Sequence, residues 1–263
     1  MPQEHTLSLE SRQVLIGGSP THYLVGGQGP EVVLLHGGGG DCRQWGPSLP
    51  ALAENYRVYA PDLPGFGQSP NPRDDWSVIH FVRFVEDFVQ SLGLKAVRVV
   101  GHSLGGGVAL GFAIHFPQRL ERLVLVNSLG LSRGIAFWTR LLSGALGMKW
   151  GQRTVAEALR WKQRRRGLGQ DLGASVAERQ LYLVQHILGL RGQRLTFSPR
   201  LAEVRVPTLI VWGDQDPYLP VAQARRAHQL IPGSRLEVFP RCGHAPFRDR
   251  PGEFHRLLRD FLG

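Results

Sequence analysis

Short runs of apolar, often β-branched residues alternate with longer stretches of helical spacing over most of the chain. Such short runs are typical of buried strands, whereas apolar positions three or four residues apart are typical of helices. The runs predict strands at residues 14–16, 22–25, 32–35, 57–60, 97–100, 123–126, 208–212 and 235–239. The helical spacing predicts helices at 78–92, 104–116, 221–231 and 253–262, with Ser77 as the N-cap of the first.

This alternation predicts an α/β fold with a mostly parallel sheet and helices on both faces. The first two runs are separated by Gly17-Gly18-Ser19-Pro20, which predicts an antiparallel hairpin at the start of the sheet. Parallel strands joined by right-handed crossovers place their carboxyl ends at one edge of the sheet. Ligands of open α/β sheets bind at that edge, so we look for functional residues in the loops that follow strands.

Residues 129–200 differ from the rest of the chain in composition and charge. They contain 13 basic and three acidic residues, and their net charge of +10 equals that of the whole chain. We interpret them as a helical, Arg-rich cap inserted into a core domain made of residues 1–128 and 201–263. The dense run Trp161–Arg166 is most simply a solvated face, and attraction to an anionic substrate or lipid is a second reading. Nucleic acid is not expected as a partner, because no nucleic-acid-binding motif accompanies the charge.

The overall composition is that of an ordinary globular protein, with 42% hydrophobic and 20% charged residues. No apolar run is long enough to span a membrane, and the N-terminus lacks the pattern of a signal peptide, so we expect a soluble, cytoplasmic protein. Cys42 and Cys242 are too few for a disulfide framework or a cysteine-based metal site. We expect two free thiols, with a redox link between them as a weaker hypothesis, and neither a cofactor nor a metal.

The strongest chemical signal is Gly101-His102-Ser103-Leu104-Gly105, which fits the G-x-S-x-G pattern. A predicted strand precedes it and a predicted helix follows, which is the context that the pattern requires. The sharp turn pushes the Ser103 hydroxyl above the edge of the sheet, and the glycines avoid crowding in the bend. Ser103 is therefore the predicted nucleophile.

A serine nucleophile needs a histidine base and an acid that orients it. His244 follows the last predicted strand and lies in a glycine-hinged loop at the converging edge. Asp214 and Asp216 both follow the strand that ends at Trp212. Asp214 can be used in the turn itself, so we predict Asp216 as the acid and His244 as the base. Asn127, at the other available loop position, carries no charge.

An acyl-transfer intermediate needs two main-chain N–H donors for its oxyanion. Leu104, directly after the nucleophile, supplies one. The second is expected from the glycine-rich loop His36–Gly40, where a main-chain N–H can approach a ligand closely, and we choose Gly38. A phosphate-binding loop would need a Gly-Lys-Ser/Thr sequence, which this loop lacks.

Five motifs in this order resemble the α/β-hydrolase fold superfamily, and the likeness covers nearly the whole chain. The resemblance implies an eight-stranded, mostly parallel sheet, a cap inserted after the sixth strand, and oxyanion donors at Gly38 and Leu104. Dehalogenases and epoxide hydrolases of this superfamily use aspartate at the elbow, so Ser103 argues against both. The motifs are Leu35–Gly38, Asp62–Ser69, Gly101–Gly106, Trp212–Asp216 and Gly243–Pro246.

The resemblance implies a serine hydrolase that cleaves an ester-type bond of a small, largely apolar substrate, as carboxylesterases do. Alternatives are a carbon–carbon bond hydrolase of ring-cleavage products, whose anionic substrate would suit the basic cap, and a cofactor-free perhydrolase or haloperoxidase. A non-catalytic ligand receptor on the same fold is a distant alternative. Residues 135–146 form an apolar stripe, which in the simplest interpretation packs on the core. In the alternative interpretation the stripe lines a substrate channel or contacts a membrane. Substrate-binding positions are predicted at Trp45, Phe66, Trp138 and Phe247.

Overall fold

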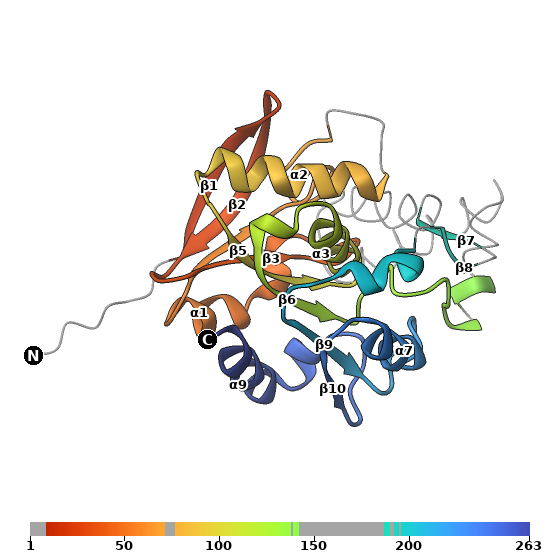
Figure 1. Ribbon diagram of the computed structural model, residues 1–263. Coiled ribbons are helices and arrows are strands. Elements are labelled where there is room, and N and C mark those ends of the chain that lie inside the picture. Colours follow the sequence, from red (N-terminus) through yellow and green to blue (C-terminus); the bar gives the residue numbers. More distant parts are fainter. Residues whose placement is uncertain (1–8, 72–76, 138, 142–186, 190–191, 195) are drawn as a thin grey trace, which may run out of the picture.

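The computed structural model describes residues 9–71, 77–137, 139–141, 187–189, 192–194 and 196–263 (Figure 1). They form one eight-stranded sheet with helices on both faces. The pairs β1–β2 and β2–β4 are antiparallel, and the other pairs of neighbouring strands are parallel. In spatial order the strands are β1 (Glu10–Ile16), β2 (Ser19–Gly26), β4 (Arg57–Pro61), β3 (Glu31–Leu35), β5 (Val97–His102), β6 (Leu120–Val126), β9 (Thr208–Gly213) and β10 (Arg235–Phe239).

Every predicted strand and helix has a counterpart in this architecture. The N-terminal hairpin is confirmed as the pair β1–β2, and the predicted helices are α2 (Val78–Ser91), α3 (Leu104–His115), α7 (Ala222–Leu230) and α9 (Pro251–Leu262). Ser77 caps α2 as predicted, because its hydroxyl accepts a hydrogen bond from the main-chain N–H of His80. The short helix α1 (Ser48–Ala53) was not predicted, since six residues are too few to show a helical period.

Alternate residues of the central strands enter two separate hydrophobic cores. Val33 and Leu35 of β3 pack into the core under α2, α3 and α7, whereas Val32 and Leu34 pack into the core under α1 and α9. All four side chains are fully buried. A strand that is covered on both faces has a continuous apolar run in its sequence, and β3 could therefore be predicted.

Helix α3 lies unusually close to β3, because the first turn of α3 is rich in glycine. A Cβ atom added to Gly105 would lie 2.3 Å from the main-chain oxygen of Leu35, and one added to Gly106 would lie 2.5 Å from the hydroxyl of Ser128. This close packing brings the N-terminus of α3 next to the loop that follows β3. The turn at Ser103 and the glycine-rich loop are thereby placed side by side at the carboxyl edge of the sheet.

Most of the predicted cap, residues 142–186 with the basic run 161–166, lies outside the described residues. The described residues of the predicted cap include a small antiparallel pair, β7 (Leu188–Gly189) and β8 (Gly192–Gln193). The boundaries of the cap, its role and its contact with a membrane therefore stay predictions. No helix formed by the described residues is long and apolar enough to cross a membrane.

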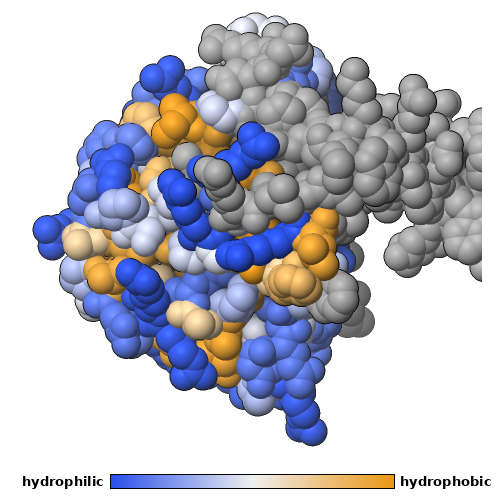
Figure 2. Space-filling view, turned by 90° about the vertical axis from the view of Figure 1, so that its right-hand side faces the viewer, coloured by the Kyte–Doolittle hydropathy of each residue, from blue (hydrophilic) through white to orange (hydrophobic). Residues whose placement is uncertain are grey.

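Hydrophobic residues on the described surface are dispersed. On the face shown in Figure 2 they form small patches between hydrophilic residues. Two of the large exposed side chains, Phe137 and Tyr218, belong to segments in direct contact, because the main-chain N–H of Ala136 donates to the carbonyl oxygen of Tyr218 at 2.8 Å. The exposed large hydrophobic residues in the described part are Leu15, Phe137, Leu141, Tyr218 and Leu230.

Candidate active site

Ser103 occupies a strained turn between β5 and α3. Its φ of 52° and ψ of −112° lie outside the regions that non-glycine residues favour. The turn needs glycine at its flanks: a Cβ on Gly101 would lie 2.3 Å from the main-chain oxygen of Gly105. The Ser103 main chain is fixed by hydrogen bonds from its N–H to Val126 (3.0 Å) and from Leu129 to its carbonyl (2.9 Å). This is the geometry that the G-x-S-x-G pattern requires.

His244 and Asp216, which are 28 residues apart in sequence, meet at the same edge of the sheet. Nδ1 of His244 lies 2.7 Å from Oδ2 of Asp216. The Asp216 side chain is fully buried and that of His244 is 19% exposed. Because a carboxylate only accepts hydrogen bonds, the ring proton of neutral His244 is on Nδ1. Nε2 then carries the lone pair that a general base needs.

Asp216 is oriented by further donors as well as by His244. Its Oδ1 accepts hydrogen bonds from the main-chain N–H groups of Tyr218 (2.8 Å) and Leu219 (3.1 Å). Its Oδ2 accepts one from Nδ2 of Asn127 at 2.6 Å. By contrast, Asp214 accepts one longer hydrogen bond, from the main-chain N–H of Cys242 at 3.4 Å. The buried, multiply bonded carboxylate is therefore Asp216, the residue that the sequence favoured.

Asn127 is a site residue that the sequence argument missed. It directly follows β6, is fully buried, and adopts a left-handed backbone conformation with φ of 41°, which asparagine tolerates better than most residues. Its Oδ1 accepts the main-chain N–H of Gly213 at 3.3 Å. The amide thereby links the end of β9 to Asp216. Its position after a strand is a signal in the sequence, but an uncharged side chain there does not indicate a partner of the acid.

The predicted oxyanion donors, the N–H groups of Gly38 and Leu104, lie in the loop after β3 and at the start of α3. The first N–H groups of a helix have no partner inside it. The Gly38 loop is held by His36, whose Nδ1 donates to Gly37 O at 2.8 Å and whose Nε2 accepts from Leu63 at 3.0 Å. Within the described part of the chain, no residue accepts a hydrogen bond from either N–H. Their role as oxyanion donors stays a prediction.

Three predicted substrate-binding aromatics lie beneath the site and not on its open rim. Trp45, Phe66 and Phe247 are each at most 1% exposed, and the rings of Trp45 and Phe247 pack against each other with centroids 4.7 Å apart. A buried ring can shape a pocket only through the residues that it supports, so their part in substrate binding stays a prediction. Trp138 lies outside the described residues.

Tyr218 is the exposed aromatic residue that the sequence argument overlooked. Its side chain is on the surface, and its ring meets the His244 ring edge-on with centroids 5.1 Å apart. Its main-chain N–H holds Asp216, so one residue contacts both members of the pair. The signal for Tyr218 in the sequence is its position two residues after Asp216.

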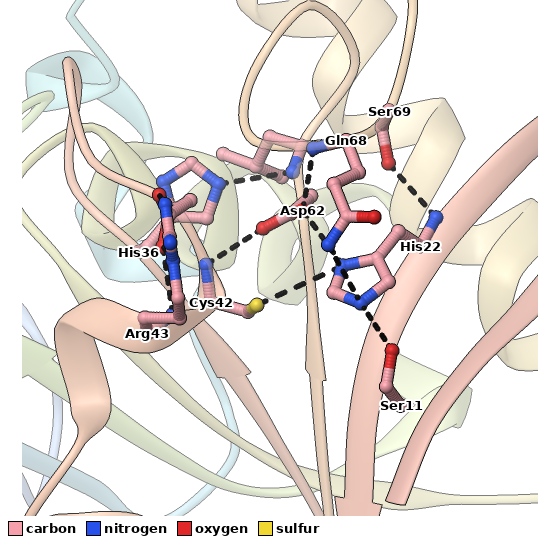
Figure 3. A network of polar contacts seen from close by, with 10 residues as sticks. Ser11, His22, His36, Cys42, Arg43, Asp62, Gln68 and Ser69 are labelled. Carbon is pink, nitrogen blue, oxygen red and sulfur yellow. Dashed lines mark hydrogen bonds and ion pairs between the residues drawn. The ribbon is translucent and has the colours of Figure 1, made fainter. Parts of the chain in front are cut away.

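A buried polar network beside the site has the composition of a metal centre (Figure 3). Ligand atoms of His22, Cys42 and Asp62 lie within 4.8 Å of one another. These atoms already have partners: Asp62 accepts hydrogen bonds from His22 Nδ1 (2.8 Å), Cys42 N–H (2.7 Å) and Gln68 N–H (2.9 Å). Burial, reinforced by the Asp62 charge, also raises the pKa of the Cys42 thiol, whereas a metal ligand must be a thiolate.

The chemistry of these donors therefore fits a structural network better than a metal site. Asp62 joins the loop after β4 to Cys42, which follows the glycine-rich loop, and His22 ties both to β2. The network thus holds the Gly38 loop in place. Cys42 and Cys242 are both free and buried, and burial raises the pKa of Cys242 to about 12. The expectation of two free thiols agrees with the structure.

Comparison with known proteins places the chain in a family. Residues 30–251 match the alpha/beta hydrolase fold family. The chain belongs to this family. The α/β hydrolase is 33% identical over 279 residues to 2-hydroxy-6-oxo-2,4-heptadienoate hydrolase from Pseudomonas putida, with 95% of each chain covered.

Solved structures give the same result for the fold of this α/β hydrolase. The meta-cleavage product hydrolase CumD from Pseudomonas fluorescens matches with a TM-score of 0.76 and 25% identity, covering 95% of this chain and 97% of that one. Carboxylesterase CesB from Bacillus subtilis matches with a TM-score of 0.78 and 23% identity, covering 98% and 92%. The α/β hydrolase fold predicted from the five motifs is therefore confirmed.

Proposed function

We propose that this α/β hydrolase is a serine hydrolase that cleaves an ester-type bond of a small, largely apolar substrate through an acyl-enzyme. The observation that carries the proposal is the 2.7 Å contact between His244 and the buried Asp216, at the sheet edge that also holds the strained Ser103 elbow. A paired histidine and carboxylate beside an elbow serine are the parts of a nucleophilic triad. Their order along the chain, Ser103, Asp216, His244, is that of α/β hydrolases.

In the first half of the reaction, Ser103 Oγ attacks the ester carbonyl carbon and its proton passes to Nε2 of His244. The carbonyl oxygen becomes an oxyanion, which the N–H groups of Gly38 and Leu104 stabilise. When the carbon–oxygen bond breaks, the His244 proton goes to the departing alkoxide, and an alcohol leaves. An ester then joins the acyl group to Ser103.

Water reverses these steps in the second half. It gives a proton to His244 and attacks the acyl carbon, and the new oxyanion occupies the same two donors. Collapse of this intermediate breaks the bond to Ser103, which regains its proton from His244, and a carboxylic acid leaves. Asp216 stays ionised throughout, holds the His244 ring and stabilises the imidazolium that forms twice in each cycle.

The described surface next to His244 supports an apolar substrate. Tyr218 is exposed and stands edge-on to the His244 ring, and the neighbouring segment carries the exposed Phe137. Apolar side chains around a few polar groups are typical of small-molecule sites. The basic residues of 129–200 would add attraction for an anionic substrate.

A second candidate is carbon–carbon bond hydrolysis of a ring-cleavage product. It is favoured by the relative from Pseudomonas putida, whose name describes hydrolysis of a 2-hydroxy-6-oxo-dienoate. The same triad would serve, but the leaving group would be a carbon acid, so a proton must reach carbon. An anionic dienoate would also suit the charge of 129–200.

The test compares wild-type protein with Ser103→Ala on p-nitrophenyl esters of increasing acyl length and on 2-hydroxy-6-oxo-6-phenylhexa-2,4-dienoate. Ser234→Ala, a surface change before β10, is the matched control. If Ser103→Ala abolishes ester turnover and Ser234→Ala leaves it unchanged, the result supports the esterase. If the protein hydrolyses only the dienoate, the second candidate is favoured. If Ser103→Ala retains turnover of either substrate, both candidates are overturned.

A further inference from the structure

His102, the residue before the nucleophile, makes a direct contact with the main chain of His244. Its Nε2 lies 2.8 Å from the carbonyl oxygen of His244. A carbonyl only accepts, so Nε2 of His102 is the donor and carries the ring proton. This hydrogen bond joins the end of β5 to the loop after β10, across 142 residues of sequence.

The His102 ring is enclosed by aromatic rings. Its centroid lies 4.7 Å from that of His244, and it meets Phe247 edge-on at 5.0 Å and Trp45 edge-on at 6.5 Å. The side chain is 3% exposed. Such packing leaves the ring a single orientation, so its donor points at one acceptor.

The surroundings of Nδ1, the second ring nitrogen of His102, favour the neutral form of the ring. Nδ1 of His102 is buried and has no hydrogen-bond partner among the described residues. It faces Gly37: a Cβ atom on Gly37 would lie 2.7 Å from it. A proton on Nδ1 would meet no acceptor there. Burial, and next the charge on His244, lower the pKa of His102 well below its usual range, so the ring remains a neutral donor.

We infer that His102 is a positioning residue for the general base: by holding the His244 carbonyl, it keeps Nε2 of His244 aligned with the Ser103 hydroxyl. The inference rests on the proposed function. The His244 side chain is otherwise held by the hydrogen bond from Nδ1 to Asp216 and by ring contacts with Tyr218 and His102. The hydrogen bond from His102 adds an attachment at the main chain of His244 itself. The flanking Gly243 is bound separately, because its main-chain N–H donates to Asp249 at 2.8 Å.

The test uses two variants of His102 and one matched control. His102→Leu fills the ring's space without a donor, whereas His102→Gln places an amide donor near the position of Nε2. His255→Leu is the control, because His255 is also buried and bonded, to Ser48 at 2.9 Å, but lies in α9 and bonds to α1. Each protein is assayed for kcat and KM on the best ester and for the rate and final stoichiometry of fluorophosphonate labelling at Ser103.

His102→Leu is expected to lower kcat and the labelling rate by about 10- to 100-fold, because small misplacements of catalytic groups have effects of this size. KM and the labelling stoichiometry are expected to stay near wild type, and His102→Gln is expected to recover most of the rate. A labelling rate unchanged in His102→Leu would overturn the inference. A fall in stoichiometry alone would also overturn it, since that indicates only fewer folded molecules.

Proton NMR gives a readout that needs no substrate. The Nδ1 proton shared by His244 and Asp216 is expected as a downfield resonance in wild type, His102→Gln and His255→Leu, and as a broadened or missing one in His102→Leu. An intact resonance in His102→Leu would overturn the inference. Failure of wild-type protein to label or turn over would instead overturn the proposed function, and the NMR comparison would still decide the role of His102.

Discussion

Asn127 and His244 donate to the same oxygen of Asp216, at 2.6 Å and 2.7 Å. Asn127 is fully buried at the end of β6, which lies between β5, the strand before Ser103, and β9, the strand before Asp216. A neutral amide in this place supplies a donor without adding charge. We therefore expect the site to distinguish asparagine from aspartate at this position, where either side chain would fit by size.

Asn127→Asp is expected to lower kcat/KM at neutral pH by at least about 10-fold. Two carboxylates in hydrogen-bond contact cannot both ionise easily, so they share a proton and His244 loses part of its counter-charge. The measurement is the pH profile of kcat/KM on the best ester. Asn55→Asp, at an exposed position, is the control and should leave the profile unchanged. Equal activity in both variants would show that Asn127 has no part in orienting the acid.

Asp216→Asn is expected to reduce kcat on the order of 10⁴-fold, because an amide donating to Nδ1 would leave His244 with its proton on the wrong nitrogen. Asp214→Asn is the matched control, since Asp214 follows the same strand and contacts the main chain of Cys242. It should stay within about threefold of wild type. If Asp214→Asn caused the large loss of kcat and Asp216→Asn the small one, Asp214 would be the acid.

The sequence could predict most of this fold because its central strands are buried on both faces and therefore read as apolar runs. It could also predict the elbow, since Gly101 and Gly105 are required by contacts within a few residues and with β3. The contact of Asn127 with the acid could not be predicted, because it joins the ends of two strands: Asn127 follows β6, and its partner Asp216 follows β9. No local pattern marks such a relationship.

The direction of a side chain was equally hard to predict. Trp45 and Phe247 are in loop regions next to the site, and from their positions alone either could face a substrate. In the structure they pack on each other and on His102, beneath the site. Burial of large rings is decided by the packing of segments far apart in sequence. The same packing gives His102 its fixed orientation.

Gly37→Ala is expected to reduce both stability and activity. The new methyl group would lie 2.7 Å from Nδ1 of His102 and 3.2 Å from Cβ of Ser103, so one of these side chains must shift. Overpacking of this kind typically destabilises a protein by about 1–3 kcal/mol. Urea unfolding and ester kinetics measure the two effects. Wild-type values in both would mean that the loop moves away at no cost.

Gly252→Ala is expected to stabilise the protein by about 0.5–1 kcal/mol without changing activity. Gly252 is exposed in the first turn of α9, has no positive φ, and a Cβ atom there would meet nothing within 4 Å. Alanine mainly reduces the freedom of the unfolded chain. The same unfolding and kinetic measurements apply, and loss of stability would contradict the helical assignment of this turn.

The buried His102 is expected to make the protein less stable as the pH falls below about 6.5. Its pKa is lowered in the folded state from a usual value of 6.5, so between the two values the unfolded chain binds more protons and unfolding is favoured by acid. Above about pH 7 the ring is neutral in both states and has no such effect. His115 and His255 shift in the same direction, so the wild-type slope contains their contributions as well.

The difference between wild type and His102→Gln isolates the effect of His102. One proton bound only by the unfolded state changes the free energy of unfolding by about 1.4 kcal/mol per pH unit. Urea unfolding at several pH values between about 7.5 and 5 should therefore give a slope shallower by up to that amount in the variant. If the free energy of unfolding has the same pH slope in wild type and His102→Gln, His102 takes up its proton in the folded protein. In acid solution its hydrogen bond to His244 would then come from an imidazolium.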